Sequence, residues 1–258
     1  MFVDSHCHLN KLNLTLHDNQ LDNPVNAARA VGVSHILCIG IDLETMDEVL
    51  AVAERYPHVY ATVGTHPLYQ ESKEPTVEAL LAYADHPKVI GIGETGLDYY
   101  YCDKDNEWQG RRFITHIQAA RQSGLPLIIH TRDARQQTIA SLREYGQGQV
   151  SGVLHCFTES LDMALQAVEL GFYISISGIV TFRSADQLRQ VVEALPLDRL
   201  LIETDAPWLA PVPYRGKENE PKYVIEVAKK IAEIKNVDVE EVAKTTSDNF
   251  FQLFQKAQ

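Results

Sequence analysis

Two histidines separated by one residue stand near the N-terminus, in the stretch Asp4-Ser5-His6-Cys7-His8. They follow a short hydrophobic stretch, Phe2-Ser5, that favours a β-strand. Because alternate side chains of a strand share one face, His6 and His8 can present two imidazoles to one metal ion while Cys7 points away. A His-x-His pair is also common among ordinary surface and core histidines. A metal site therefore requires further ligands at equivalent positions later in the chain.

Further metal-binding residues stand at the ends of later hydrophobic stretches. Each one alone has an ordinary explanation, as a hydrogen-bonded core histidine or as an acid in an ion pair. Together they make four histidines and two carboxylates, which suffice for two divalent ions if the stretches end at one place. Following the first, fourth, fifth, sixth and eighth stretches, these candidates are His6 and His8, Glu94, His130, His155 and Asp205.

The segments that must position these residues alternate regularly along the chain. Short apolar, β-branched stretches are separated by amphipathic segments with helical spacing, a pattern typical of βαβ units and a parallel sheet. Several of the helical segments stop at a glycine. The expected helices include Asn23-Val31, Asp105-Ser123 and Leu161-Leu170. The expected strands are Phe2-Ser5, Ser34-Ile41, Val59-Gly64, Val89-Glu94, Leu125-His130, Ser151-His155, Phe172-Ser177 and Leu200-Thr204.

Eight β/α units in 258 residues predict an α/β fold, a (β/α)8 TIM barrel that forms a single domain over residues 1–258. Beyond the eighth strand, Pro221-Lys235 has apolar residues at helical spacing. Asp238 and Glu241 predict a capping box for an extra C-terminal helix, which Asn249-Phe254 would pack on the barrel. The chemistry of such barrels lies at the C-terminal ends of the strands, so we expect the candidate ligands to meet at one mouth.

The composition limits the partners and the location. A formal net charge of −12 argues against broad electrostatic attraction to nucleic acid or to an anionic membrane, although two bound divalent ions would supply local positive charge. We found no apolar run long enough to cross a membrane and no secretory signal after Met1. The scattered cysteines suit reduced thiols, so we expect a cytoplasmic protein without membrane contact. These cysteines are Cys7, Cys38, Cys102 and Cys156.

Six motifs resemble those of the TatD family of metal-dependent deoxyribonucleases and hydrolases, with the closest likeness to its bacterial YcfH-type branch. The resemblance covers essentially the whole chain, and the family belongs to the wider amidohydrolase group of barrels. The motifs are Asp4-Ser5-His6-Cys7-His8-Leu9, Gly64-Thr65-His66-Pro67, Gly93-Glu94-Thr95-Gly96-Leu97-Asp98-Tyr99-Tyr100, His130-Thr131-Arg132-Asp133-Ala134, Leu154-His155-Cys156-Phe157-Thr158 and Glu203-Thr204-Asp205-Ala206-Pro207.

The resemblance implies two divalent cations that share Glu94, since a carboxylate has two oxygens and can span two ions. Histidine and carboxylate ligands leave zinc, manganese and magnesium open. The ions would lower the pKa of a water, which then attacks as the nucleophile, and would stabilise the charge that develops on the substrate. The implied ligands are His6, His8, Glu94 and Asp205 for one ion, and Glu94, His130 and His155 for the second.

Asp205 is the candidate to take the proton of the attacking water, with the role of a ligand alone as the alternative. Both Asp205 and Glu94 are therefore predicted to be catalytic. His66, at the end of the third predicted strand, is expected from the resemblance to contact the substrate, and otherwise to orient a ligand. Arg132 could bind a phosphate in bidentate fashion, with a salt bridge between loops as the alternative.

Three further groups have two open interpretations each. Glu203 supports a ligand histidine or is an acid of the barrel core with an ion-pair partner. The aromatic run Tyr99-Tyr100-Tyr101, with Trp108, stacks on unpaired bases or packs a long loop over the rim. A last group forms a basic rim or is simply solvated. It comprises Tyr214-Arg215-Gly216-Lys217, Asn219 and Arg183.

The residues themselves indicate metal-assisted hydrolysis, and the resemblance directs it to phosphodiester bonds in DNA, at an end or in a single strand. One alternative is hydrolysis of a small ester, lactone, amide or aminoacyl ester, which the acidic net charge favours. The other is a metal-dependent binding protein without turnover. No obligate protein partner is expected.

Overall fold

The computed structural model describes residues 1–102 and 107–257. Eight strands alternate with eight helices in these ranges, and a ninth helix follows. The strands are β1 (Phe2–Cys7), β2 (Val33–Cys38), β3 (Val59–Val63), β4 (Val89–Asp98), β5 (Leu127–Arg132), β6 (Gly152–Leu154), β7 (Phe172–Ile176) and β8 (Leu200–Ile202). The helices are α1 (Asp22–Ala30), α2 (Met46–Arg55), α3 (Val77–Ala84), α4 (Glu107–Ser123), α5 (Arg135–Gly146), α6 (Leu161–Glu169), α7 (Asp186–Ala194), α8 (Val224–Lys235) and α9 (Val239–Leu253).

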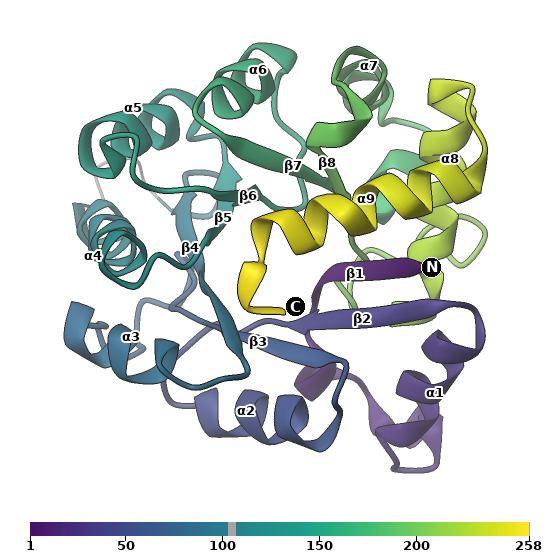
Figure 1. Ribbon diagram of the computed structural model, residues 1–258, viewed down its shortest axis with the longest axis horizontal. Coiled ribbons are helices and arrows are strands. Elements are labelled where there is room, and N and C mark those ends of the chain that lie inside the picture. The colour runs from purple at the N-terminus through teal and green to yellow at the C-terminus, as the bar shows by residue number, and fades with distance from the viewer. Residues whose placement is uncertain (103–106, 258) are drawn as a thin grey trace.

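The strands form one parallel sheet in the order of the sequence and roll into a ring with the helices outside (Figure 1). The predicted (β/α)8 barrel is thereby confirmed. Side chains join β8 to β1 at the seam of the ring. Asp4 accepts hydrogen bonds from the backbone N–H of Thr204 at 2.8 Å and from its hydroxyl at 2.6 Å, and the Ser5 hydroxyl donates to the carbonyl of Ile202 at 3.0 Å.

Alternation along the strands divides the apolar residues between two layers. In and after β2, Leu37 and Ile39 point into the barrel, whereas Ile36 and Cys38 pack against the helices. The N-terminal end of the barrel is closed by α9 and the short helix η6 (Gln255–Ala257), which bring Phe250 and other apolar residues to the inner layer. Figure 1 shows α9 lying across the strands, with the C-terminus near the middle of the ring. The extra C-terminal helix therefore seals the end opposite to the predicted site.

Several strand ends differ from the predicted ones. β1 continues to Cys7 instead of ending at Ser5, β4 continues to Asp98 instead of Glu94, and β8 ends at Ile202. The apolar pattern stops where polar residues of the site begin, whereas the backbone pairing of β1 and β4 continues past them. Glu94 therefore lies inside a strand, where every residue from Val89 to Asp98 is buried. The pairing of β8 instead stops before the predicted end at Thr204.

The predicted helices agree closely with the structure, with two differences. The predicted start of the fourth helix at Asp105 lies outside the described residues, and its described part begins at Glu107. The capping-box prediction was wrong, because Asp238 stands at the N-cap of α9 but its side chain accepts no capping hydrogen bond. Its backbone carbonyl accepts from the N–H groups of Glu241 and Val242, at 3.1 and 3.3 Å, so the first turn forms without the side chain.

A buried polar stripe on α4 holds the segment that follows β3. Gln109, Arg112 and His116 are spaced to lie on one helix face and are almost fully buried. The guanidinium of Arg112 donates to the carbonyls of His66 and Tyr69, both at 2.9 Å. Further along the stripe, Gln109 donates to the carbonyl of Pro67 at 3.0 Å, and His116 Nε2 accepts from the Thr65 N–H at 3.0 Å. These contacts fix the path of the chain around His66.

His116→Gln should weaken the dependence of stability on pH. Burial lowers the pKa of His116 from 6.5 to about 4, so the unfolded chain takes up a proton more readily than the folded chain. The stabilising contribution is fully present above pH 6.5 and is lost as pH falls from 6.5 to about 4, by up to roughly 3 kcal/mol. Urea unfolding of both proteins at several pH values measures this. The His116→Gln variant should lose less stability over that range. The control is His86→Gln, at a partly exposed histidine, which should behave as wild type. Equal losses of stability in all three proteins would contradict the role of His116.

Candidate metal centre

The six predicted ligands meet at the C-terminal mouth of the barrel, around Glu94. His155 Nε2 lies 2.7 Å from Glu94 Oε1, and His6 Nε2 lies 3.4 Å from Glu94 Oε2. His8 Nε2 and His130 Nδ1 lie 3.8 and 3.5 Å from the same carboxylate. Asp205 Oδ1 lies 3.5 Å from the Nε2 atoms of both His6 and His8. The structure thus brings together every residue predicted to bind metal.

The backbone makes room for this cluster at Gly96 of β4, which pairs with His130 of β5. Its φ of +137° is one that other residues rarely adopt. A Cβ atom at this position would lie 1.9 Å from the His130 carbonyl oxygen. Only glycine therefore lets β4 and β5 approach closely enough to set Glu94 beside His130.

Mutual charge keeps the cluster ionised in spite of its burial. Burial alone would raise the pKa of Glu94, but the imidazoles of His155, His66 and His6 hold it well below its usual range. Burial also opposes protonation of His155, yet the carboxylates of Glu94 and Glu203 raise its pKa well above 6.5. The pKa of Asp205 is likewise lowered, with the hydrogen bond from His8 and the charge of His6 outweighing burial. The site contains carboxylates that require neighbouring positive charge.

The donor set fits divalent cations. Among the described residues, His155 Nε2 is buried without a hydrogen-bond partner and faces Glu94, and the Nε2 atoms of His6 and His8 face Asp205. One oxygen or nitrogen from each of His6, His8 and Asp205 lies within 4.8 Å of the other two, and the same holds for His66, Glu94 and His130. Cations at these places would satisfy the free lone pairs and neutralise the carboxylates. Imidazole with carboxylate suits zinc, manganese and magnesium.

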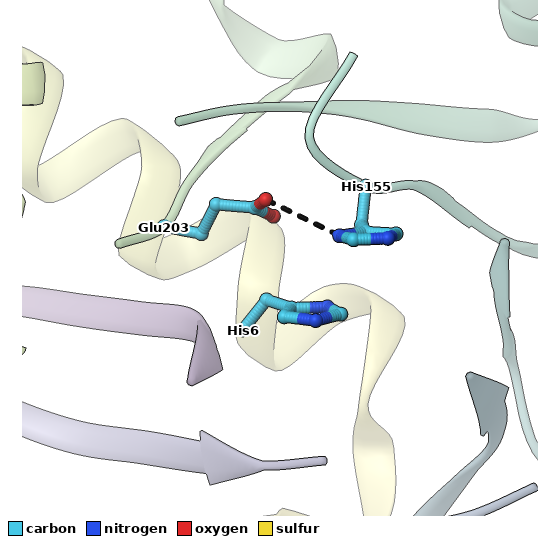
Figure 2. Close-up of side chains that lie close together, drawn as sticks. All are labelled: His6, His155 and Glu203. Atoms are coloured by element: carbon cyan, nitrogen blue, oxygen red, sulfur yellow. Dashed lines mark ion pairs between the residues drawn. The ribbon is translucent and has the colours of Figure 1, made fainter. Parts of the chain in front are cut away.

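Glu203 lies beside two of the histidines and points its carboxylate toward His155 (Figure 2). The rings of His6 and His155 are stacked, with centroids 3.8 Å apart and an angle of 7° between their planes. Glu203 Oε1 accepts a hydrogen bond from the Cys156 N–H at 2.8 Å and lies 3.4 Å from His155 Nδ1. His155 therefore faces Glu203 with one nitrogen and Glu94 with the other, an arrangement in which a carboxylate orients a ligand histidine.

His66 and Arg132, predicted to bind substrate, line the same cavity of about 770 Å³. His66 Nε2 lies 3.2 Å from Glu94 Oε1, so this imidazole is close enough to the centre to contact a group bound there. The guanidinium of Arg132 lies over the ring of Tyr100 at 3.8 Å and over that of Tyr101 at 4.9 Å. Within residues 1–102 and 107–257 the guanidinium has these two ring contacts and no ion pair, and both the phosphate-binding role and the salt bridge between loops stay predictions.

The other groups divide between rim and core. Asn219 is buried and donates to the carbonyls of Thr204 and Trp208 at 2.7 and 2.6 Å, so it shapes the last loop and does not form a basic rim. Arg215 packs over Phe182, 3.7 Å from the ring centroid. Trp108 lies under the Arg112 guanidinium and packs the loop, whereas Tyr100 and Tyr101 are exposed.

Two residues of the site were not assigned a role from the sequence. Asp98 hydrogen-bonds His130 Nε2 through Oδ2 at 2.9 Å, and Trp208 is half exposed on the cavity wall with its ring 5.0 Å from that of His8. The signal for Asp98 was its spacing, because Glu94, Gly96 and Asp98 alternate along one strand and share a face. For Trp208 it was only its position three residues after Asp205.

Comparison with known proteins agrees with this geometry. The model of the family described as TatD related DNase matches residues 3–255. The chain belongs to the TatD family. It is 46% identical to the metal-dependent hydrolase YcfH of Escherichia coli, over 98% of this chain and 95% of that protein. The assignment as a metal-dependent hydrolase is thereby confirmed.

Two further relatives extend the comparison. The TatD-family chain is 34% identical to the 3'-5' ssDNA/RNA exonuclease TatD of Escherichia fergusonii, over 90% of this chain and 92% of that protein. Among solved structures, the TatD homologue YjjV of Escherichia coli superposes with a TM-score of 0.90 at 30% identity, covering 98% of both chains. No described helix of this TatD-family chain is both long enough and apolar enough to span a bilayer.

Glu94→Gln should weaken metal binding by at least about 100-fold, because it removes the negative charge of the carboxylate that lies among the ligand imidazoles. Isothermal titration of metal-free protein with Mn²⁺ and with Zn²⁺ measures the affinity. Glu159→Gln, at another buried glutamate that pairs with Arg135 away from the imidazoles, is the matched control and should bind as wild type. Unchanged affinity in the Glu94 variant would remove this residue from the centre.

Gly96→Ala should destabilise the metal-free fold by about 2–4 kcal/mol, because the added methyl group meets the His130 carbonyl and the φ of Gly96 is strained for alanine. Chemical unfolding in the presence of a chelator measures the change. Gly110→Ala in α4 is the control, since a Cβ there has open space. The control should leave stability unchanged or raise it by up to about 1 kcal/mol. Equal stabilities for both variants would contradict the close-approach argument.

Proposed function

We propose that this enzyme is a two-ion nuclease that hydrolyses phosphodiester bonds of DNA, at an end or in an unpaired strand. The observation that carries the proposal is the convergence of six donor side chains, with Glu94 at their centre, at the floor of an open cavity. We further infer that residues 1–258 act as one barrel unit. Its scattered cysteines, none of them in a Cys-x-x-Cys pair, suit work in the cytoplasm, and it requires no obligate protein partner.

The proposed ligands divide into two sets that share Glu94. Two divalent ions held there would lower the pKa of a water and stabilise the charge that develops on the phosphoryl oxygens. This chain contributes a fixed floor with little room for water, because four of its six donors, His6, His8, Glu94 and His155, are buried. The first set is His6, His8, Glu94 and Asp205, and the second is Glu94, His130 and His155.

Asp205 is the proposed general base. It is ionised, and its side chain is 13% exposed, more than that of Glu94 at 4%, so it can reach a water in the cavity. Accepting the proton of the attacking water and returning it to the leaving oxygen requires such a carboxylate at the open side of the site. Glu94 contributes the shared negative charge that keeps both sets of ligands together.

The rim is proposed to bind the strand. His66 reaches the centre, and Arg132 supplies a planar cation for a phosphate oxygen. The exposed rings of Tyr100, Tyr101 and Trp208 offer faces on which unpaired bases can stack, worth about 1–3 kcal/mol per base. The Escherichia fergusonii relative is named an exonuclease on single-stranded DNA and RNA, which supports a strand without a complement.

A second candidate is hydrolysis of a small ester, lactone, amide or aminoacyl ester. It is favoured by the formal charge of −12 and by the cavity lining, in which Arg132 is the single lysine or arginine among the described residues. The same ions and the same base would serve either reaction.

Asp205→Asn should lower kcat by at least about 100-fold, because an amide cannot accept the proton, while one or both ions remain bound. Single-turnover assays with saturating Mn²⁺, alongside metal analysis of the variant, separate the two effects. Asp186→Asn, at an exposed aspartate of α7 paired with Arg189, is the control and should retain full activity. Full activity in Asp205→Asn would limit this residue to a ligand.

Metal-loaded protein should shorten end-labelled single-stranded DNA faster than the matching duplex, and chelator should abolish cleavage without unfolding the chain. The same preparation is assayed on RNA and on a panel of small esters and lactones. The expected result is at least a roughly tenfold preference for the single strand over the duplex, since bases in a duplex have no free faces. Turnover of a small ester with no cleavage of DNA or RNA would reverse the ranking of the two candidates.

A further inference from the structure

Asp98 ends β4 with both carboxylate oxygens engaged. Oδ2 accepts a hydrogen bond from His130 Nε2 at 2.9 Å. Oδ1 accepts from the backbone N–H groups of Tyr100 and Tyr101, each at 3.0 Å. The carboxylate is buried, and the backbone of Asp98 is itself held by the side chain of Gln109, which accepts from its N–H at 3.0 Å and donates to its carbonyl at 3.3 Å.

The first contact fixes how His130 faces the centre. An ionised carboxylate can only accept, so His130 Nε2 carries the ring proton. The other nitrogen, Nδ1, then has a free lone pair and lies 3.5 Å from Glu94 Oε1. The hydrogen bond to Asp98 therefore selects both the tautomer and the orientation in which His130 can bind an ion.

The second contact fixes the rim of the cavity. By accepting from two successive N–H groups, Oδ1 closes a turn directly after β4 and sets the positions of Tyr100 and Tyr101. These two rings lie over the guanidinium of Arg132, which stands two residues after His130 on β5. One carboxylate thus contacts the histidine of the centre and the turn that carries the aromatic rim.

We propose that Asp98 is a positioning residue that couples the metal centre to the substrate rim, holding His130 with one oxygen and the Tyr100–Tyr101 turn with the other. This inference rests on the proposed two-ion centre. It assigns Asp98 no direct contact with the substrate. Because its two oxygens act on different parts of the site, their loss should have separable effects.

The comparison of Asp98→Asn with Asp98→Ala separates them. An asparagine that keeps both backbone hydrogen bonds through its carbonyl oxygen must turn its NH₂ group to His130. His130 Nε2 then has to accept, and its proton moves to Nδ1, where it blocks the ligand lone pair. Asp98→Asn should therefore weaken the ion that His130 holds and keep the rim, whereas Asp98→Ala should lose both.

Titration with Mn²⁺ and with Zn²⁺ should show the affinity for one of the two ions reduced roughly 10- to 100-fold in both variants. With end-labelled single-stranded DNA at saturating metal, KM should stay within about twofold of wild type for Asp98→Asn and rise several-fold for Asp98→Ala. The matched control is Asp42→Asn. Asp42 is also buried and also closes a turn, by accepting hydrogen bonds from the N–H and the hydroxyl of Thr45, but it contacts no histidine. This variant should bind both ions as wild type.

Nitrogen-15 NMR of His130 in the wild-type chain, assigned by comparison with His130→Gln, tests the same inference without depending on how the Asp98 variants fold. In the metal-free protein, at a pH high enough for the ring to be neutral, the single proton should be on Nε2, and metal should shift the Nδ1 resonance. A neutral ring with its proton on Nδ1, or wild-type metal affinity in folded Asp98→Asn, overturns the positioning role alone. If neither metal shifts a nitrogen resonance of His130 in the wild-type protein, both the positioning role and the two-ion centre are overturned.

Discussion

The carboxylate of Glu94 lies within 3.8 Å of nitrogen atoms from five imidazole rings, and this concentration of charge constrains the rest of the molecule. An ionised carboxylate in the interior needs positive charge beside it. Imidazoles supply that charge only when protonated, and a protonated imidazole has no lone pair for a metal. Divalent ions remove the conflict, because they neutralise the carboxylates and leave the rings neutral and coordinating. The arrangement is therefore better suited to bound cations than to protons.

Such a cluster can exist only on a rigid frame. β4 is buried along its whole length and approaches β5 at Gly96, which brings Glu94 and His130 together. The polar face of α4 fixes the chain around His66, and Asp4 with Thr204 joins β1 to β8 just before Asp205. Most of the apolar stabilisation lies elsewhere, inside the barrel and under the outer helices, and α9 closes the opposite end. Stability and chemistry thus occupy different ends of the barrel.

The sequence predicts the barrel and all six proposed ligands, because both depend on regular spacing. Apolar stretches at intervals give the strands, and residues such as His155 and Asp205, placed just beyond them, must meet at one mouth. Strand ends were less predictable, since a strand such as β4 continues through polar residues that the apolar pattern excludes. The spacing of Asp98 places it on the same strand face as Glu94 but does not show that it meets His130, and nothing in the spacing of Trp208 shows that it faces His8.

The charge of the chain bears directly on the kind of polymer that suits this mouth. With a formal charge of −12, the protein as a whole repels a polyanion, so attraction would have to come from the proposed cations and from Arg132. Stacking on Tyr100, Tyr101 and Trp208 adds affinity that requires no charge and is screened little by salt. Bases offer free faces only where they are unpaired. The net negative charge of the chain and the aromatic rim thus support the proposed preference for single strands and ends, whose bases would supply the affinity that the net charge opposes.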